Sequence, residues 1–468
     1  MAKKIFFILL VIVTTGLACR GRAYSYEGLF ATLEAFKKDD RILILAPHPD
    51  DETIGCAGVI QAALKAGASV RIAYLTNGDH NQVAFVVYEK RLVVRKGAFL
   101  HMGEVRRKEA IAAMQLFGLS EKNLTFMGYP DFGTFTIFTR CWLGEQAFSN
   151  LFTCTSSVPY ETNLSFGAPY KGESILIDLK TVLLDYRPTK IFTSHPADVN
   201  VDHKALYLFL EVALADLRKH IPQPNVYPYL IHCVGWPLPR HYHPHLGLER
   251  PDRFSRSPIH WRRFFLDRYE LDKKYQAILC YKSQTASSAF YLLSFARRNE
   301  LFGNYPDIKL KMQHSAEISV NPLAAYIRIF KSIGAENLDR YDIVDSATSV
   351  SYELKDGSFY IRINKTEKLK ERFGSLIYLF GYSYKRPFAE MPKIRVVTLS
   401  DKIKIFDKNS VIKPKDVGLQ LEPGKLLLKI PLSVLGNPDF ILVSVKAYGR
   451  TTPVDAVAFR KIVIREQK

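Results

Sequence analysis

The first part of the chain alternates between short aliphatic runs and longer segments with apolar residues at helical spacing. The run at 41–46 (RILILA) is typical of a buried parallel strand. Residues 53–66 have the periodicity of a helix, and Gly67 stands where a glycine commonly ends one. Since a second strand is predicted at 69–75, this order indicates a strand–helix–strand unit with parallel strands.

The same alternation continues to about residue 302. Further helices are predicted at 106–117, 175–184, 204–217, 271–280 and 288–302, and further strands at 190–193 and 226–234. Alternation of this kind predicts an α/β layer fold with a mostly parallel sheet and flanking helices. In such sheets, ligands bind beyond the carboxyl ends of the strands.

The pattern changes from about residue 342. Strand-like sequence at 350–364 surrounds Asp356-Gly357, a dipeptide typical of a type I′ hairpin turn. Helical periodicity is scarce here, so an all-β, sandwich-like domain is predicted. We expect the chain to divide into residues 24–325 and residues 340–468. Further strands are predicted at 376–382, 394–399, 426–430 and 440–446.

Residues 1–23 have the pattern of an export signal. Lys3-Lys4 precedes an unbroken apolar run at 5–13, which is too short to span a bilayer and fits a signal peptide. Processing is expected either at Cys19, which would then be lipidated as in a lipoprotein, or after Gly21-Arg22-Ala23. We therefore expect a protein exported to a bacterial cell envelope or secreted, with membrane attachment through Cys19 if that residue is lipidated.

The composition is that of an ordinary globular protein, 47% hydrophobic and 24% charged, which excludes disorder, collagen and coiled coil as the main architecture. Lys plus Arg exceeds Asp plus Glu by 65 to 46, a formal net charge of +19 that favours acidic partners. There is no compact basic block or aromatic-basic RNA motif, so we interpret the excess as a solvated surface and expect no nucleic-acid partner.

The cysteines show no CxxC pairing, which argues against a cysteine zinc site. In an oxidising compartment Cys141 and Cys154 either form a disulfide or remain as two buried thiols.

Candidate catalytic residues follow the first predicted strand directly. The segment PHPDDE contains His48 and, within the next four positions, the carboxylates of Asp50, Asp51 and Glu52. Carboxylates this close would repel one another, so a cation is their natural partner. Imidazole plus carboxylate suits zinc or a similar divalent ion.

A second group follows the strand at 190–193 and contains Asp198, Asn200, Asp202 and His203. His203 can supply a second imidazole at the same sheet edge. Two histidines and one aspartate leave coordination positions open, as in a catalytic zinc site. A helix cap in a charged turn would explain either group alone, but it does not explain both groups at strand-to-helix junctions of one sheet.

At these residues the sequence resembles the LmbE/PIG-L family of N-acetylglucosaminyl deacetylases. PHPDDE is the first motif of that family, and Asp198–His203 resembles its downstream D-x-H-x-D-H. The resemblance covers about residues 40–305 and does not extend to the C-terminal region. Secondary matches are Thr76-Asn77-Gly78, Arg106-x-x-Glu109, Gly128-Tyr129-Pro130-Asp131, Lys274-x-x-Ala277 and Tyr281-x-Ser283-Gln284.

The resemblance implies a Rossmann-like fold, a zinc ion or another divalent metal, and hydrolysis of an N-acetyl group from an amino sugar, glycan or glycoconjugate. Carried onto this chain, it makes His48, Asp51 and His203 the metal ligands. Asp50 would be the general base that activates water, and Asp202 would be a carboxylate that orients a histidine.

Asn200 stands where the family often has a histidine. Asn can donate a hydrogen bond to an oxyanion but cannot act as an acid. Either Asn200 is such a donor, or His195 or His232 takes the proton role, or activity is reduced. Two alternatives to a sugar deacetylase therefore remain: an amidase on another N-acyl compound, and a weakly catalytic envelope protein that binds metal or glycan.

Aromatic residues raise two further questions. The insertions at 80–103 and 138–172, with Trp142, either form a sugar-stacking lid or pack on the flank of the domain. Tyr378, Tyr382 and Tyr384 either stack on sugars or lie in the core of the C-terminal domain.

Overall fold

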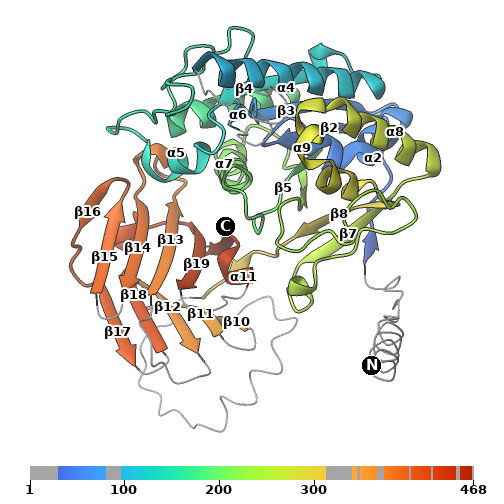
Figure 1. Cartoon of the computed structure of the whole chain (residues 1–468). Helices are drawn as coiled ribbons and strands as arrows, with labels where there is room; N and C mark the ends of the chain where they lie inside the picture. Colours follow the sequence, from blue (N-terminus) through green and yellow to red (C-terminus); the bar gives the residue numbers. More distant parts are fainter. Residues whose placement is uncertain are drawn as a thin grey trace, which may run out of the picture.

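The computed structural model contains an α/β part and a C-terminal part rich in antiparallel strands, which confirms the predicted fold class (Figure 1). The predicted export signal, Cys19 and the domain boundary near 325–340 lie outside the described residues and stay predictions. Among the described residues, no helix combines the length and the apolar character needed to cross a membrane. The structure describes residues 30–80, 96–311, 340–344, 348–365, 374–399, 402–422, 425–448 and 454–465.

The α/β part is built on an eight-stranded sheet with the order β1-β7-β8-β6-β5-β2-β3-β4. At its centre β2 pairs in parallel with both β3 and β5, so their carboxyl ends share one edge. The strands are β1 (Ala31–Thr32), β2 (Arg41–Ala46), β3 (Ser69–Thr76), β4 (Leu124–Tyr129), β5 (Lys190–Ser194), β6 (Asn225–Tyr229), β7 (His260–Phe265) and β8 (Asn299–Asn304).

Helices cover both faces of this sheet (Figure 1). In β2, Ile42 and Ile44 belong to one apolar core, with α2 and α8, while Leu43 and Leu45 belong to the other, with α6 and α7. This two-sided burial explains why β2 reads as a continuous aliphatic run. The helices are α2 (Asp51–Lys65), α4 (Lys96–Leu116), α5 (Thr134–Arg140), α6 (Gly172–Tyr186), α7 (Val201–Leu217), α8 (Arg268–Cys280) and α9 (Lys282–Leu292).

The helix predicted at 288–302 is wrong in its second half. Helix α9 ends at Leu292, and Asn299–Asn304 form strand β8 instead. That strand lies between β6 and β7 and is antiparallel to both, so the sheet rather than a helix satisfies its backbone. Apolar residues at helical spacing up to Phe302 did not distinguish this buried strand from a helix.

The C-terminal part consists of two sheets that enclose one apolar core, as a sandwich does. Their orders are β10-β11-β12-β18-β17 and β16-β15-β14-β13-β19-β20-β9. The strands are β9 (Ile308–Lys309), β10 (Arg340–Val344), β11 (Thr348–Lys355), β12 (Ser358–Lys365), β13 (Gly374–Tyr382), β14 (Lys393–Leu399), β15 (Lys402–Asp407), β16 (Ser410–Ile412), β17 (Gly418–Glu422), β18 (Lys425–Pro431), β19 (Phe440–Tyr448) and β20 (Arg460–Val463), with the short helix α11 (Val454–Val457) before β20.

The predicted hairpin joins β11 to β12. Asp356 and Gly357 both have positive φ, 47° and 69°, as a type I′ turn requires. Asp tolerates this left-handed conformation better than most residues, and Gly adopts it without steric cost.

The two parts share an apolar interface at α5 and α7 (Figure 1). Phe138 contacts Phe209 of α7 at 4.9 Å and Phe380 of β13 at 5.1 Å between ring centroids. Trp142 is fully buried and lies 5.2 Å from Phe388. Trp142 therefore packs between the two parts rather than forming a sugar-stacking lid.

One of the three C-terminal tyrosines, Tyr382, is a core residue: it is buried and stacks on Phe440 at 4.7 Å. Tyr378 is half-buried and packs against Phe135 of α5. Tyr384 is half-buried beneath Arg218, whose guanidinium lies 3.6 Å from the ring centroid.

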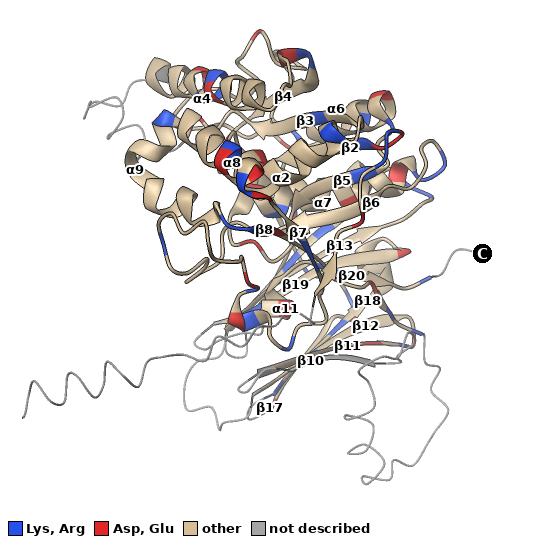
Figure 2. Cartoon of the chain, turned by 90° about the vertical axis from the view of Figure 1, so that its right-hand side faces the viewer, with Lys and Arg blue, Asp and Glu red and all other residues tan. Residues whose placement is uncertain are grey.

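Acidic and basic residues are interspersed along several elements (Figure 2), and the two cysteines Cys141 and Cys154 do not pair. Figure 2 shows basic and acidic positions interspersed on α4 and α8 and basic positions on strands of the C-terminal part. Cys141 is a buried free thiol and Cys154 is an exposed free thiol. The predicted disulfide is therefore wrong, and the alternative of two buried thiols holds for Cys141 alone.

Candidate active site

The PHPDDE segment joins β2 to α2 through a sharp turn at Asp50. This residue has φ 119°, in the region that favours glycine. Its carbonyl accepts hydrogen bonds from Thr53 N (3.0 Å) and Ile54 N (2.9 Å), and its own N–H donates to Glu52 Oε2 (3.1 Å). Backbone strain of about 1–3 kcal/mol persists where surrounding structure enforces it, and such residues cluster at functional sites.

The three predicted metal ligands come together at the carboxyl edge of the sheet. Asp51 Oδ2 lies 3.1 Å from His48 Nδ1 and 3.1 Å from His203 Nε2. The two imidazole rings are 5.4 Å apart between centroids. All three side chains are buried, and they form one of the groups able to hold a metal ion.

This arrangement fits a metal ion. Ligand atoms bonded at about 2.0–2.1 Å in a tetrahedral site are separated by about 3.3 Å, close to the two distances at Asp51. Within the described part of the chain, neither nitrogen of His203 makes a hydrogen bond of normal geometry, although both lie near carboxylate oxygens. A buried imidazole oriented in this way suits a cation better than a hydrogen-bonded pair.

A second layer of carboxylates holds the far side of each imidazole. His48 Nε2 lies 3.2 Å from Asp131 Oδ1 and 3.3 Å from Asp202 Oδ2, and His203 Nδ1 lies 3.2 Å from Asp198 Oδ2. Metal-binding histidines commonly present their second nitrogen to a carboxylate, which fixes ring orientation. The contacts of Asp131 and Asp198 with these imidazoles were not predicted from the sequence. The position of Asp131 directly after β4, at the same sheet edge, was the available signal.

Asp202 is positioned by the loop before α5. Its carboxylate accepts hydrogen bonds from Phe132 N (2.7 Å) and Thr134 N (3.2 Å), and also from the Thr134 hydroxyl. Asn200 is the N-cap of α7, because its Oδ1 accepts a hydrogen bond from Asp202 N at 2.8 Å. Asn200 therefore has a structural role as a helix cap, apart from the role of an oxyanion donor.

Arg106 of α4 reaches the turn at Asp50. Its Nη2 donates to Asp50 Oδ2 (3.2 Å) and to Pro49 O (2.6 Å), and its Nη1 donates to Gly78 O (3.0 Å). Glu109 points elsewhere and accepts two hydrogen bonds from Ser283 of α9. Arg106 thus supports the turn at Asp50, whereas Glu109 joins α4 to α9.

Burial dominates the electrostatics of the site. Burial raises the pKa of Asp50 to about 8, even though Arg106 acts in the opposite direction. For Asp51, burial is outweighed by His203 and His48, which hold its pKa well below the usual range. The N-termini of α2 and α7 both face this edge, and their dipoles favour negative charge there.

Glu52 is directed away from the predicted ligands. Its Oε1 accepts hydrogen bonds from Thr53 Oγ1 (2.8 Å) and from the Tyr281 hydroxyl. Burial raises the pKa of Glu52 to about 7. Glu52 therefore ties α2 to the start of α9.

The two further histidines occupy different positions. His195 is fully buried, stacks on Trp261 at 5.7 Å and accepts a hydrogen bond at Nδ1 from Ala197 N, so it is a packing residue outside the ligand group. His232 lies 4.7 Å from His203 between ring centroids and forms a second possible metal group with His203 and Asp198. The structure thus brings His232, but not His195, to the site.

Comparisons with known proteins bear on the family of the α/β part. The profile of the PIG-L family, described as GlcNAc-PI de-N-acetylase, matches residues 43–214. A comparison with curated proteins gives no match.

Several solved structures are similar to the chain. A conserved protein from Thermus thermophilus is 21% identical, with 52% of this chain and 80% of that chain covered and a TM-score of 0.30. The N,N'-diacetylchitobiose deacetylase from Pyrococcus horikoshii is 17% identical, with 56% and 82% covered and a TM-score of 0.32. The 4-carboxy-2-hydroxymuconate hydratase GalB from Pseudomonas putida is 16% identical, with 60% and 100% covered and a TM-score of 0.35.

The matched range begins in β2 and ends in α7, so it includes both strand-to-helix junctions and every residue of the predicted ligand group. The resemblance inferred from the sequence is confirmed over this range. Residues 43–214 of the chain form a domain of the PIG-L family.

Proposed function

We propose that the chain is a metal-dependent N-deacetylase that hydrolyses the acetamido group of an N-acetylated amino sugar, glycan or glycoconjugate. The observation that carries this proposal is the convergence of His48, Asp51 and His203 beside Asp50 at one sheet edge. The PIG-L domain at 43–214 supports it. The three converging side chains would hold zinc or another divalent ion, which when bound polarises an amide carbonyl and lowers the pKa of water.

Asp50 is the general base in this proposal. Its carboxylate, held at Oδ2 by Arg106, takes a proton from the attacking water while the water oxygen bonds to the acetyl carbon. The carbon–nitrogen bond then breaks, and the proton passes from Asp50 to the leaving nitrogen. The products are acetate and a free amine.

The surrounding residues keep this geometry fixed. Asp131 and Asp202 orient His48, and Asp198 orients His203. His232 is the second group placed to exchange a proton with the leaving nitrogen, since its ring lies next to His203. These roles follow from contact with the predicted ligands.

Export from the cytoplasm is also part of the proposal. Lys3-Lys4 and the apolar run at 5–13 support it, and a substrate in or outside a bacterial envelope would follow. The mass of the mature N-terminus, measured after expression in a bacterial host, distinguishes a lipidated Cys19 from cleavage after Ala23 and from no cleavage.

Acetate release is the direct test of the activity. The zinc-loaded mature protein is incubated with chitooligosaccharides and with acetylated bacterial surface polysaccharide, with and without a chelator. We expect chelator-sensitive acetate from at least one of them. Release of another acid from a different N-acyl compound would replace the substrate class, and a tightly bound metal without any hydrolysis would refute the enzymatic proposal.

A further inference from the structure

The seven-stranded sheet of the C-terminal part has a basic outer face. Alternate residues of its strands, such as Ile377 of β13 and Ile394 of β14, fill the core of the sandwich, so the residues between them point away from that core. Along β13, β14, β15 and β19, the exposed and half-buried outward positions hold four cations and no carboxylate. We call these four residues the basic face: Arg395, Lys402, Lys404 and Lys446.

Other groups of the protein do not balance this charge. Within the residues that the structure describes, none of the four forms an ion pair. Lysines often protect an edge strand from pairing with another chain, but these cations lie on β14, β15 and β19, and the edge strands of this sheet are β16 and β9. One row across the sheet runs from Lys446 through Leu376 and Val397 to Lys404, so its two cations are about 14 Å apart at the usual strand spacing. The charge is therefore spread over an extended surface.

The α/β part borders the basic face at α5 (Figure 1). The ring of Phe135 lies 5.3 Å from that of Tyr378, which pairs with Arg395 across the sheet. Asn409, in the turn after β15, donates a hydrogen bond to Arg140 O at the end of α5 (3.4 Å). Burial and the Arg140 guanidinium lower the pKa of Arg395, as expected where two like charges approach each other.

A second pair of like charges connects the basic face to the candidate active site. Lys204 directly follows His203 in α7, and it forms no ion pair with any described residue. Burial and the Lys446 ammonium lower the pKa of Lys204, although Asp198 acts in the opposite direction. The basic face therefore begins beside the predicted metal ligands and extends away from them over β13, β14 and β15.

We propose that the basic face binds the anionic part of an extended substrate, so that the glycan deacetylated at the metal site carries carboxylate or phosphate groups. Cations that face one another repel, and an anion between them removes that repulsion. This inference rests on the proposed deacetylase function and narrows its substrate from any N-acetylated glycan to an acidic one.

The junction of the two parts favours a chain over a membrane surface. Helix α5 packs on the outward side of the same sheet, where Phe138 contacts Phe380 and Phe135 contacts Tyr378. The basic face thus meets the α/β part at an inside corner, which a polymer can follow and a planar bilayer cannot.

The first test is binding at low ionic strength. The full chain is titrated calorimetrically with hexagalacturonate, which carries carboxylates but no acetamido group, with maltohexaose as an uncharged comparison and with phosphatidylglycerol vesicles. We expect hexagalacturonate to bind and maltohexaose not to bind. Added salt should weaken the binding, because it screens exposed charges.

The test variant reverses two charges of the basic face, Lys404→Glu with Lys446→Glu. Both side chains are exposed, so the core of the sandwich is not disturbed. We expect this double variant to bind hexagalacturonate at least about tenfold more weakly. Lys65→Glu with Lys122→Glu is the matched control, because it changes the net charge equally at exposed positions by the opposite edge of the α/β sheet, and it should bind as the wild type does.

The second test connects the basic face to turnover. Acetate release is measured with hyaluronan hexasaccharide, in which carboxylates alternate with acetamido groups, and with uncharged chitohexaose. We expect a lower KM for the hyaluronan hexasaccharide, and the double variant should raise this KM more than it changes kcat. An equal KM for the two hexasaccharides would refute an acidic substrate.

Three binding results would overturn the proposal: no binding of hexagalacturonate, binding that the double variant leaves unchanged, or a preference for the anionic vesicles. Acetate release from chitohexaose without binding of hexagalacturonate would leave the deacetylase standing and refute the role of the basic face. Binding of hexagalacturonate without acetate release from any glycan would refute the deacetylase and leave only an anion-binding surface.

Discussion

Two buried clusters of charge contact the same helix, α2, and they differ in whether the chain itself completes them. Halfway along α2, Glu300 accepts hydrogen bonds from Gly58 N (2.8 Å), Val59 N (3.1 Å) and Lys274 Nζ (2.8 Å). Both members of this ion pair are about 1% exposed. The pair is neutral and satisfied within the described structure.

The cluster at the N-terminus of α2 is not balanced in this way. Asp50, Asp51, Asp131, Asp198 and Asp202 crowd around two histidines, and Arg106 is the guanidinium that reaches them. Burying so much charge of one sign is costly unless a cation is added. The comparison shows that burial of charge alone does not identify a functional site. The surplus of carboxylates around His48 and His203, which a cation could balance, is what distinguishes the candidate site.

The largest expected effect comes from the cluster at the N-terminus of α2, and it concerns catalysis. We expect Asp50→Asn to reduce acetate release by about 10²–10⁴-fold, because the amide cannot accept the proton from water. The bound metal, measured by mass spectrometry of the protein, should stay at the wild-type level because Asp50 is not in the ligand group. Asp272→Asn, on an exposed turn of α8, is the control. Wild-type turnover by Asp50→Asn would refute the general-base assignment.

The buried Lys274–Glu300 pair should affect the stability of the fold rather than catalysis. Lys274→Met leaves the Glu300 carboxylate buried without its cation, and we expect a loss of about 3–5 kcal/mol in the free energy of unfolding. Adding Glu300→Gln removes the unpaired charge and should recover much of that loss. Urea unfolding measures both, with Lys273→Met as the matched control. If Lys274→Met alone is as stable as the wild type, the ion pair does not contribute to the free energy of unfolding.

Asp79 provides a pH-dependent test near the site. Burial and the neighbouring Asp131 raise its pKa to about 7, from 3.8 for an ordinary Asp. Between these values the folded protein retains a proton that the unfolded chain loses, so this residue reduces stability as pH rises from 4 to 7. Asp79→Asn should therefore raise the melting temperature above pH 7, by the equivalent of a few kcal/mol.

The same substitution should have little effect below about pH 4, where Asp is protonated in both states. Asp39→Asn, at an exposed position, should show no such pH dependence. Thermal unfolding at pH 4 and pH 8 distinguishes these cases. A destabilised Asp79→Asn at pH 8 would mean that the hydrogen bond from Tyr160 to Asp79 outweighs the burial cost.

The smallest expected effect concerns Asn200. Asn200→Ala removes the N-cap of α7 and should cost about 1 kcal/mol, whereas Asn200→Ser keeps a capping oxygen and should be nearly neutral. Urea unfolding compares the two. If Asn200→Ser is stable but releases acetate more slowly, the lost amide also acts in catalysis. Equal destabilisation by both substitutions would exclude the cap as the main role of Asn200.

The sequence was sufficient to predict the parts of the site that depend on local pattern. The strands at 41–46 and 190–194 are buried on both faces, so their ends and the polar residues that follow could be located from hydrophobic runs alone. The contact of Asp131 with His48 joins residues 83 positions apart, and no local pattern encodes such a distance. Strand β8 was missed for a related reason, because its place between β6 and β7 is set by pairing across the sheet.

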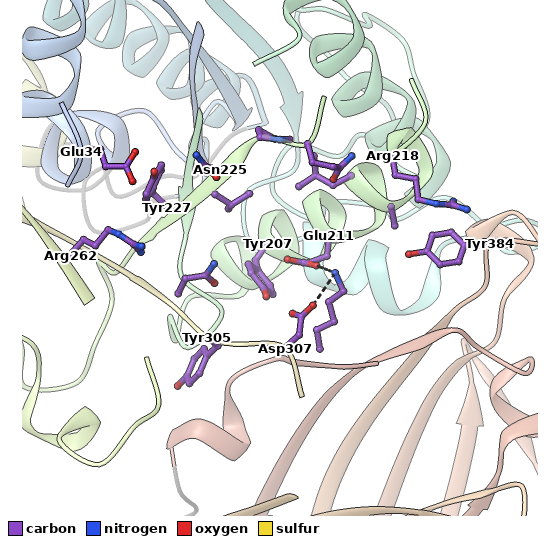
Figure 3. Close-up of a pocket in the computed structure, with 17 residues that line it drawn as sticks. Glu34, Tyr207, Glu211, Arg218, Asn225, Tyr227, Arg262, Tyr305, Asp307 and Tyr384 are labelled. Carbon is purple, nitrogen blue, oxygen red and sulfur yellow. Dashed lines mark hydrogen bonds and ion pairs between the residues drawn. The ribbon is translucent and has the colours of Figure 1, made fainter. Parts of the chain in front are cut away.

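The pocket lined by residues of both parts, among them Tyr207 and Tyr384, was equally inaccessible to sequence reasoning (Figure 3). Tyr384 was recognised as an aromatic residue of the C-terminal strands, but Glu211 and Lys461, 250 residues apart, meet only in the folded chain.

The shared interface at α5 and α7 has a consequence for how this chain can be divided experimentally. Phe380 and Phe388 of the C-terminal part cover the rings of Phe138, Trp142 and Phe209. A fragment that lacks the C-terminal part would expose these three rings to water. Such a surface promotes self-association. Expression of the PIG-L domain should therefore include the C-terminal part, since the two share one apolar core at this interface.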